Sequence, residues 1–185
     1  ALVELHELCS YLDVELGNSV MHNSWYFHKY DNIDVDRPKA VEKELAFIKS
    51  LLESRRKTWK GRLKDYGRAY FNRSICRRLS GDESIYRPHC GAGSDFLFID
   101  PLGNVSPCNG SDDEWIMGNI KDSSFEEILR SEQSISAMAN VKSCRKNCCF
   151  IVTDRHDMIR RPWIPISWII RNKVRLALNR PIHLG

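Results

Sequence analysis

The sequence predicts an α+β fold that is mainly helical and contains one short antiparallel β-hairpin. Apolar residues recur at helical spacing in several long stretches, whereas near the middle two short apolar runs flank an Asp-Pro-Leu-Gly-Asn turn. Five of the seven cysteines lie at the ends of that hairpin or in a later cluster. A chain of 185 residues, 42% of them hydrophobic, is long enough to bury the cores of one or two small domains.

Composition argues against several classes of protein. No apolar run reaches the roughly eighteen residues of a membrane-spanning helix, and no secretion signal opens the chain, so we expect a cytoplasmic protein. The odd number of cysteines, with Cys148 and Cys149 adjacent, favours reduced, metal-binding thiols over disulfides. The net charge of +4 is too small to indicate a partner. Because Ala1 already belongs to a helical pattern, we expect an excised or processed fragment.

Residues 1–12 predict an amphipathic helix, with Glu4 and Glu7 opposite its apolar stripe. That stripe consists of Leu2, Leu5, Leu8, Cys9 and Leu12. We interpret Cys9 as a core thiol rather than a ligand, because it lies on the stripe. Short extended segments at 14–16 and 19–21 are expected to follow. A helix followed by an extended segment is the repeating unit of a βα barrel.

A polar and aromatic loop follows at residues 22–30, and it has two interpretations of equal weight. It can form the wall of a substrate pocket, in which His22, Asn23 and Ser24 offer hydrogen bonds. It can equally form an aromatic plug over the rim of a barrel. We assign no catalytic role to His22 or His28.

Two linking amphipathic helices are expected within residues 38–82. Pro38 suits the first turn of the first helix, whose apolar stripe is Val41, Leu45, Ile48, Leu51 and Leu52. The second runs from about Trp59 to Leu79 and ends near Gly81. Its core residues are expected to be Trp59, Leu63, Tyr66, Tyr70, Phe71, Ile75 and Leu79, with Cys76 a buried structural thiol.

This second segment is also strongly basic between Arg55 and Arg78. Basic residues interleaved with aromatic ones can bind nucleic acid or an acidic peptide. Because the aromatic residues recur at helical spacing, we favour a helix whose aromatic side chains pack in the core and whose basic face is solvated.

The hairpin is predicted between Cys90 and Cys108, which lie at its outer ends. A tight hairpin brings its ends together, so both thiols can face one site. Cys144 is expected at the end of a helix around residues 134–141. A shorter helix is expected before it, capped by Ser123 or Ser124. Its inward-facing residues are expected to be Phe125, Ile128 and Leu129. One of Cys148 and Cys149 would complete the four sulfurs of an iron-sulfur cluster or a tetrahedral zinc site. We prefer Cys148, because neighbouring side chains diverge and both cannot readily reach one metal ion.

The spacing from Cys90 to Cys149 carries a resemblance. Twelve residues separate Cys90 from Gly103 and four separate Gly103 from Cys108; Met-Gly-Asn-Ile, Ser-Phe-Glu-Glu-Ile and a cysteine cluster then follow in order. This pattern resembles the SPASM and twitch domains, which are the C-terminal auxiliary-cluster domains of radical S-adenosylmethionine enzymes. A full SPASM domain has seven cysteines and two clusters. Only three cysteines follow Cys108 here, which suits the one-cluster twitch version.

The resemblance implies a domain order and a role. Residues 1–37 would close the edge of a partial TIM-like barrel, 38–82 would link it to an auxiliary-cluster domain at 83–152, and 153–185 would be a basic helical tail. The auxiliary 4Fe-4S cluster would transfer an electron or position the substrate, a peptide or small molecule. Backbone amides near Gly91, Gly93 and Asn109, and the side chains of Arg145 or Lys146, would tune it.

The catalytic half of such an enzyme is not found in this sequence. Its motif CxxxCxxC does not occur, because the third cysteine after Cys144 and Cys148 would fall at Ile151. S-adenosyl-L-methionine and a second 4Fe-4S cluster are therefore expected only in the parent enzyme, on a missing N-terminal barrel that would be the main partner. Two alternatives remain: a zinc-structured module that binds an acidic peptide or, less favoured, nucleic acid, and a disulfide-bonded domain.

The tail combines apolar and basic residues. They are Ile166, Trp168, Ile169, Ile170, Val174, Leu176 and Leu178, together with Arg171, Lys173 and Arg175. A basic, apolar helix with tryptophans can lie at a membrane interface, or it can pack on the remainder of the parent protein. We favour packing.

Overall fold

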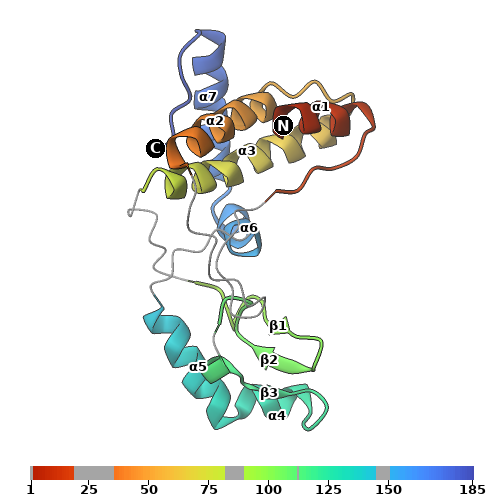
Figure 1. Ribbon diagram of the computed structural model, residues 1–185, viewed down its shortest axis with the longest axis vertical. Coiled ribbons are helices and arrows are strands. Elements are labelled where there is room, and N and C mark those ends of the chain that lie inside the picture. Colours follow the sequence, from red (N-terminus) through yellow and green to blue (C-terminus); the bar gives the residue numbers. More distant parts are fainter. Residues whose placement is uncertain (1, 19–35, 82–89, 112, 145–150) are drawn as a thin grey trace. The chain divides into compact units, whose positions relative to one another are not determined.

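The computed structural model describes residues 2–18, 36–81, 90–111, 113–144 and 151–185. These residues form two compact units (Figure 1). The helical unit contains α1 (Leu2–Tyr11), α2 (Arg37–Leu52), α3 (Trp59–Leu79), α6 (Ile151–Arg160) and α7 (Trp163–Ala177). The sheet unit contains β1 (Phe98–Ile99), β2 (Asn104–Ser106), a short 3-10 helix η2 (Asp113–Trp115), β3 (Gly118–Asn119), α4 (Phe125–Arg130) and α5 (Glu132–Ser143).

The helical unit is organised around α2 and α3, which lie side by side in Figure 1. Each begins at a capping side chain: Asp36 accepts a hydrogen bond from the Lys39 amide, and Thr58 accepts one from the Gly61 amide. Pro38 lies in the first turn of α2, as predicted. The core joins all three early helices to α7 and contains Cys9, Leu16, Phe47, Ile48, Leu51, Leu52, Ala69, Cys76 and Trp168.

The first helix forms as predicted, but it buries a different face. His6 and Cys9 are buried, whereas Leu5, Leu8 and Leu12 of the predicted stripe are exposed. The ring of His6 packs edge-on against Phe47 and contacts Asp65, so a polar contact selects the buried face. Residues 14–18 form no strand, contrary to the expectation for 14–16. Residues 19–21 and the loop at 22–30, with His22, Asn23, Ser24 and His28, lie outside the described residues.

The second linking helix, α3, also departs from its predicted pattern. Phe71, Ile75 and Cys76 are buried as expected, but Trp59 and Leu63 are exposed. The inner face of the early turns carries Asp65, a charged residue that the apolar spacing could not place there. Arg56 is buried as well, so the expected solvated basic face does not include it.

The predicted hairpin is confirmed, and it gains a third strand. The sheet has the order β1-β2-β3, and all its pairs are antiparallel. Phe98 pairs with Ser106 across the hairpin. The turn is fixed by Asp100, whose carboxylate accepts hydrogen bonds from the Leu102 and Asn104 amides. Gly103 has φ 93°, a conformation that favours glycine.

Two helices cover this sheet. Ser124 and Glu127 form a capping box at the start of α4, and Ser131 caps α5. Of the three residues expected to face inward from α4, only Ile128 is buried; Phe125 and Leu129 are exposed, because a helix of six residues presents a single turn to its core. The core of the sheet unit contains Val105, Met117, Ile128 and Ala137.

None of the described helices is long and apolar enough to span a membrane.

Candidate metal centre

Cys90 lies at the start of a tight turn that leads into the hairpin. The Asp95 amide donates to the Gly91 carbonyl at 2.7 Å, and the Gly93 amide donates to the Phe96 carbonyl at 2.8 Å. Cys90 itself is exposed. The Gly93 amide is therefore already bonded within the turn, so it is not one of the donors expected to face a cluster.

Cys108 lies two residues after the end of β2 and follows the buried Pro107. Its carbonyl oxygen accepts hydrogen bonds from the amide and the hydroxyl of Ser111 and from the hydroxyl of Ser106. Three local donors thus fix the backbone at this cysteine, whose side chain is half-buried. A fixed backbone limits the directions in which the thiol can point.

Cys144 caps the C-terminal end of α5, and its amide donates to the Val141 carbonyl at 3.2 Å. The prediction that this thiol arrives from a helix end is confirmed. α5 also contacts the turn after Cys90, because a Cβ on Gly93 would overlap the sulfur of Met138. Gly93 has φ 79°. The same Cβ would lie 3.5 Å from Cβ of Pro107, so the turn after Cys90 also lies near the residue before Cys108.

Only three of the five predicted metal ligands lie within the described residues. Cys90, Cys108 and Cys144 all belong to the sheet unit, but no three Cys, His, Asp or Glu side chains within the described residues are close enough to hold a metal ion. Cys148 and Cys149, with Arg145 and Lys146, lie outside the described residues. The ligand set therefore stays a prediction.

The chemistry of the donors fits a soft metal centre. None of the five described cysteines forms a disulfide: Cys9, Cys76, Cys90, Cys108 and Cys144. Thiolates are the ligands of iron-sulfur clusters and of structural zinc. Cys9 and Cys76 are buried in the helical unit, as expected, and burial raises the pKa of the Cys76 thiol to about 11. A buried thiol of this kind stays protonated near neutral pH, which suits a structural residue.

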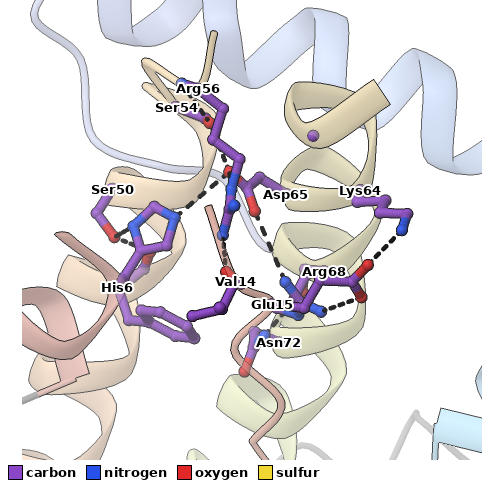
Figure 2. A network of polar contacts seen from close by, with 12 residues as sticks. His6, Val14, Glu15, Ser50, Ser54, Arg56, Lys64, Asp65, Arg68 and Asn72 are labelled. Atoms are coloured by element: carbon purple, nitrogen blue, oxygen red, sulfur yellow. Dashed lines mark hydrogen bonds and ion pairs between the residues drawn. The ribbon is translucent and has the colours of Figure 1, made fainter. Parts of the chain in front are cut away.

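A second polar site, which sequence reasoning missed, lies in the helical unit. Figure 2 shows Asp65 of α3 between His6, Ser54 and Arg56. Its Oδ2 accepts from Arg56 Nε at 3.1 Å and from Ser54 Oγ at 2.5 Å, and it lies 3.4 Å from His6 Nε2. Burial alone would raise the pKa of Asp65, but these hydrogen bonds and the charge of Arg56 outweigh it and hold that pKa below its usual value. Asp65 is therefore a carboxylate at neutral pH.

This network fixes the segment that follows α1. Arg56 Nη2 donates to the Val14 carbonyl at 2.7 Å, and Glu15 forms ion pairs with Lys64 and Arg68 (Figure 2). A shallow pocket of about 160 Å³ lies among these charged side chains. The basic residues around it are largely paired with Asp13, Glu15 and Asp65, which does not favour the alternative of an open basic face for nucleic acid.

Comparison with known protein families identifies the sheet unit. Residues 90–150 match the family model of SPASM, an iron-sulfur cluster-binding domain. The match begins at Cys90 and extends past Cys149, so it includes all five candidate ligands, and it confirms the resemblance for this third of the chain. A comparison with curated proteins and with solved structures gives no match.

Proposed function

We propose that the sheet unit holds one auxiliary 4Fe-4S cluster through Cys90, Cys108, Cys144 and one of Cys148 and Cys149, with Cys148 preferred. The observation that carries this proposal is the match of residues 90–150 to an iron-sulfur cluster-binding domain. The positions of the three described cysteines, beside a hairpin and at a helix end, agree with it.

The protein residues position these ligands. Met138 packs α5 against the turn after Cys90, and Ser106 and Ser111 fix the carbonyl of Cys108. A bound cluster would supply a one-electron redox centre, whose potential depends on net charge, on hydrogen bonds to its sulfurs and on exposure to solvent. The described thiols are exposed or half-buried, so solvent would reach this centre.

We further propose that this region belongs to a radical S-adenosylmethionine enzyme, with the cluster serving electron transfer or substrate positioning. The first helix supports this context, because Leu5, Leu8 and Leu12 are exposed apolar side chains within the predicted barrel edge at residues 1–37. The rest of a barrel would cover such a surface. S-adenosyl-L-methionine and the first cluster would bind that barrel, since no CxxxCxxC motif occurs among the 185 residues.

Anaerobic reconstitution tests the cluster assignment. We expect brown protein that absorbs in the thiolate-to-iron charge-transfer region, with about four iron and four sulfide ions per chain. Cys108→Ala and Cys144→Ala should lose most of the iron, whereas Cys9→Ala, the matched control in the helical unit, should keep it. Comparing Cys148→Ala with Cys149→Ala identifies the fourth ligand. Colourless protein with one zinc ion, or full iron content in Cys108→Ala, would overturn the proposal.

A further inference from the structure

Helix α7 has two apolar faces, and only one of them is covered by the rest of the helical unit. Trp168, on the inner face, is 3% exposed. The outer residues Trp163, Ile166, Ile170, Val174 and Leu178 are between 53% and 63% exposed. We call these five residues the outer stripe. Because a helix turns about 100° per residue, Ile166, Ile170 and Val174 lie on the side opposite Trp168.

The inner face is held by directional contacts. The Trp168 ring packs edge-on against Tyr70 with centroids 5.6 Å apart, and its Nε1 donates to the His183 carbonyl at 2.8 Å. The side chain of Asn172 both accepts from the His183 amide and donates to the His183 carbonyl. Lys173 Nζ donates to the Leu52 carbonyl at 2.8 Å. Rotating α7 to bury the outer stripe would break these contacts, so within this unit the stripe stays exposed.

The charge around α7 has one sign. From Met158 to Gly185 the sequence contains no aspartate or glutamate but six basic residues: Arg160, Arg161, Arg171, Lys173, Arg175 and Arg180. Arg160, Arg161, Arg171 and Arg180 are exposed. Arg171 flanks the outer stripe beside Ile170, and Arg160 and Arg161 lie at the end that carries Trp163. Within residues 158–185, the apolar stripe is accompanied by basic residues and by no acidic ones, which is complementary to a surface with an apolar interior and anionic head groups.

We infer that the outer stripe of α7 docks the protein on an anionic lipid membrane, with the helix lying in the plane of the interface. Interfacial helices combine a tryptophan-containing apolar face with arginines that contact lipid phosphates. The 15 residues of α7 extend about 22 Å, which is shorter than the roughly 30 Å hydrocarbon layer. The contact is therefore peripheral. The inner face of α7 packs on the helical unit of this same chain, so the packing on the remainder of the parent protein that we favoured from the sequence stays a prediction.

Vesicle co-sedimentation of the full chain tests this inference. We expect binding to vesicles of equal parts phosphatidylcholine and phosphatidylglycerol, and little binding to phosphatidylcholine alone. Ile170→Ser should weaken binding about tenfold, because it removes one apolar side chain from the interface. Arg171→Gln should weaken it about fivefold, and only on the anionic vesicles. Both residues are exposed, so neither variant should change the melting temperature.

Ile135→Ser is the matched control, since Ile135 is an equally exposed isoleucine on α5. It should bind as the wild-type chain does. Equal binding to both kinds of vesicle, no binding to either, or wild-type binding by Ile170→Ser would overturn the inference. Sedimentation equilibrium without lipid adds an independent outcome: a dimer that Ile170→Ser converts to a monomer would assign the outer stripe to a second copy of the chain instead.

Discussion

At the scale of single residues, buried charge decides how the helical unit responds to pH. Glu44 of α2 is buried, and its Oε1 has no hydrogen-bond partner among the described residues. Burial raises the pKa of this carboxyl to about 7, although a hydrogen bond with Asn18 acts in the opposite direction. Between about pH 4.5 and 7, the folded protein therefore binds a proton on Glu44 that the unfolded chain has lost.

The first prediction follows from this difference in proton binding. Because the folded state binds more protons than the unfolded state, stability should fall by about 3 kcal/mol as the pH rises from 4.5 to 7, and then level off. Glu44→Gln should remove this decline and raise the melting temperature at pH 8. Thermal unfolding at a series of pH values measures both effects. Glu42→Gln, an exposed position on the same helix, is the control and should leave the decline in place.

The second prediction concerns Asp65, whose carboxylate offsets the buried charge of Arg56. Asp65→Asn would leave Arg56 buried without its counter-charge, so it should cost about 3–5 kcal/mol of unfolding free energy in urea. The pKa of Asp65 is lowered, so the stability it contributes is present at neutral pH and is lost as the pH falls through its folded value. Asp13→Asn removes an exposed partner of the same arginine and should cost at most about 1 kcal/mol. Similar costs for the two variants would contradict the assigned role.

At the scale of elements, the contact between α5 and the turn after Cys90 depends on a glycine. Gly93 has φ 79°, and a Cβ there would overlap the sulfur of Met138. Gly81 provides a natural comparison, because it has φ 76° but nothing within 4 Å of its ideal Cβ. The two positions thus separate backbone strain from crowding.

The third prediction uses this pair. Gly81→Ala should cost about 1 kcal/mol from backbone strain alone, whereas Gly93→Ala should add roughly 1–3 kcal/mol of crowding and lower the iron retained after reconstitution. Shortening the crowded side chain should relieve part of this loss. In a double-mutant cycle, Gly93→Ala with Met138→Ala should therefore lose less stability than the sum of the two single variants. Strict additivity would show that the two residues do not meet.

The elements themselves were predictable to different degrees. Pro38, Ser124 and the Asp-Pro-Leu-Gly-Asn turn act within a few residues of themselves, so their helices and hairpin were predicted correctly. The buried face of α1 was not predicted correctly, because it is set by the contact between His6 and Asp65, which is 59 residues away in the sequence. The pairing of β3 with β2 was not predicted, since it is a contact between separate segments of the chain.

At the scale of the whole molecule, the described parts of the two units differ in how many buried apolar residues they contribute to a core. The described helical core joins nine buried residues from α1, α2, α3, α7 and the segment after α1. The described sheet core contains four: Val105, Met117, Ile128 and Ala137. Because metal binding free energy adds to folding free energy, the proposed cluster would contribute more to the stability of the sheet unit than to that of the helical unit.

The fourth prediction is that removing the cluster destabilises the sheet unit selectively. Hydrogen exchange of the reconstituted and the cluster-free protein should show faster exchange of α5 amides after removal. The amides of α2 serve as the internal control and should exchange at the same rate in both forms. Equal exchange of α5 in the two forms would show that the sheet unit folds independently of a cluster.

By itself, the sequence determined the mainly helical class, the hairpin, the separation of two core cysteines from the other five, and the SPASM-like spacing from Cys90 to Cys149. These features depend on local sequence patterns, or on a tight turn that brings residues on either side of it close together. The tertiary structure alone decided that Asp65 and Arg56 are buried together, that Met138 packs beside Gly93, and that α7 keeps its outer stripe exposed. Each of these results depends on which distant segment covers a residue, and no local periodicity contains that information.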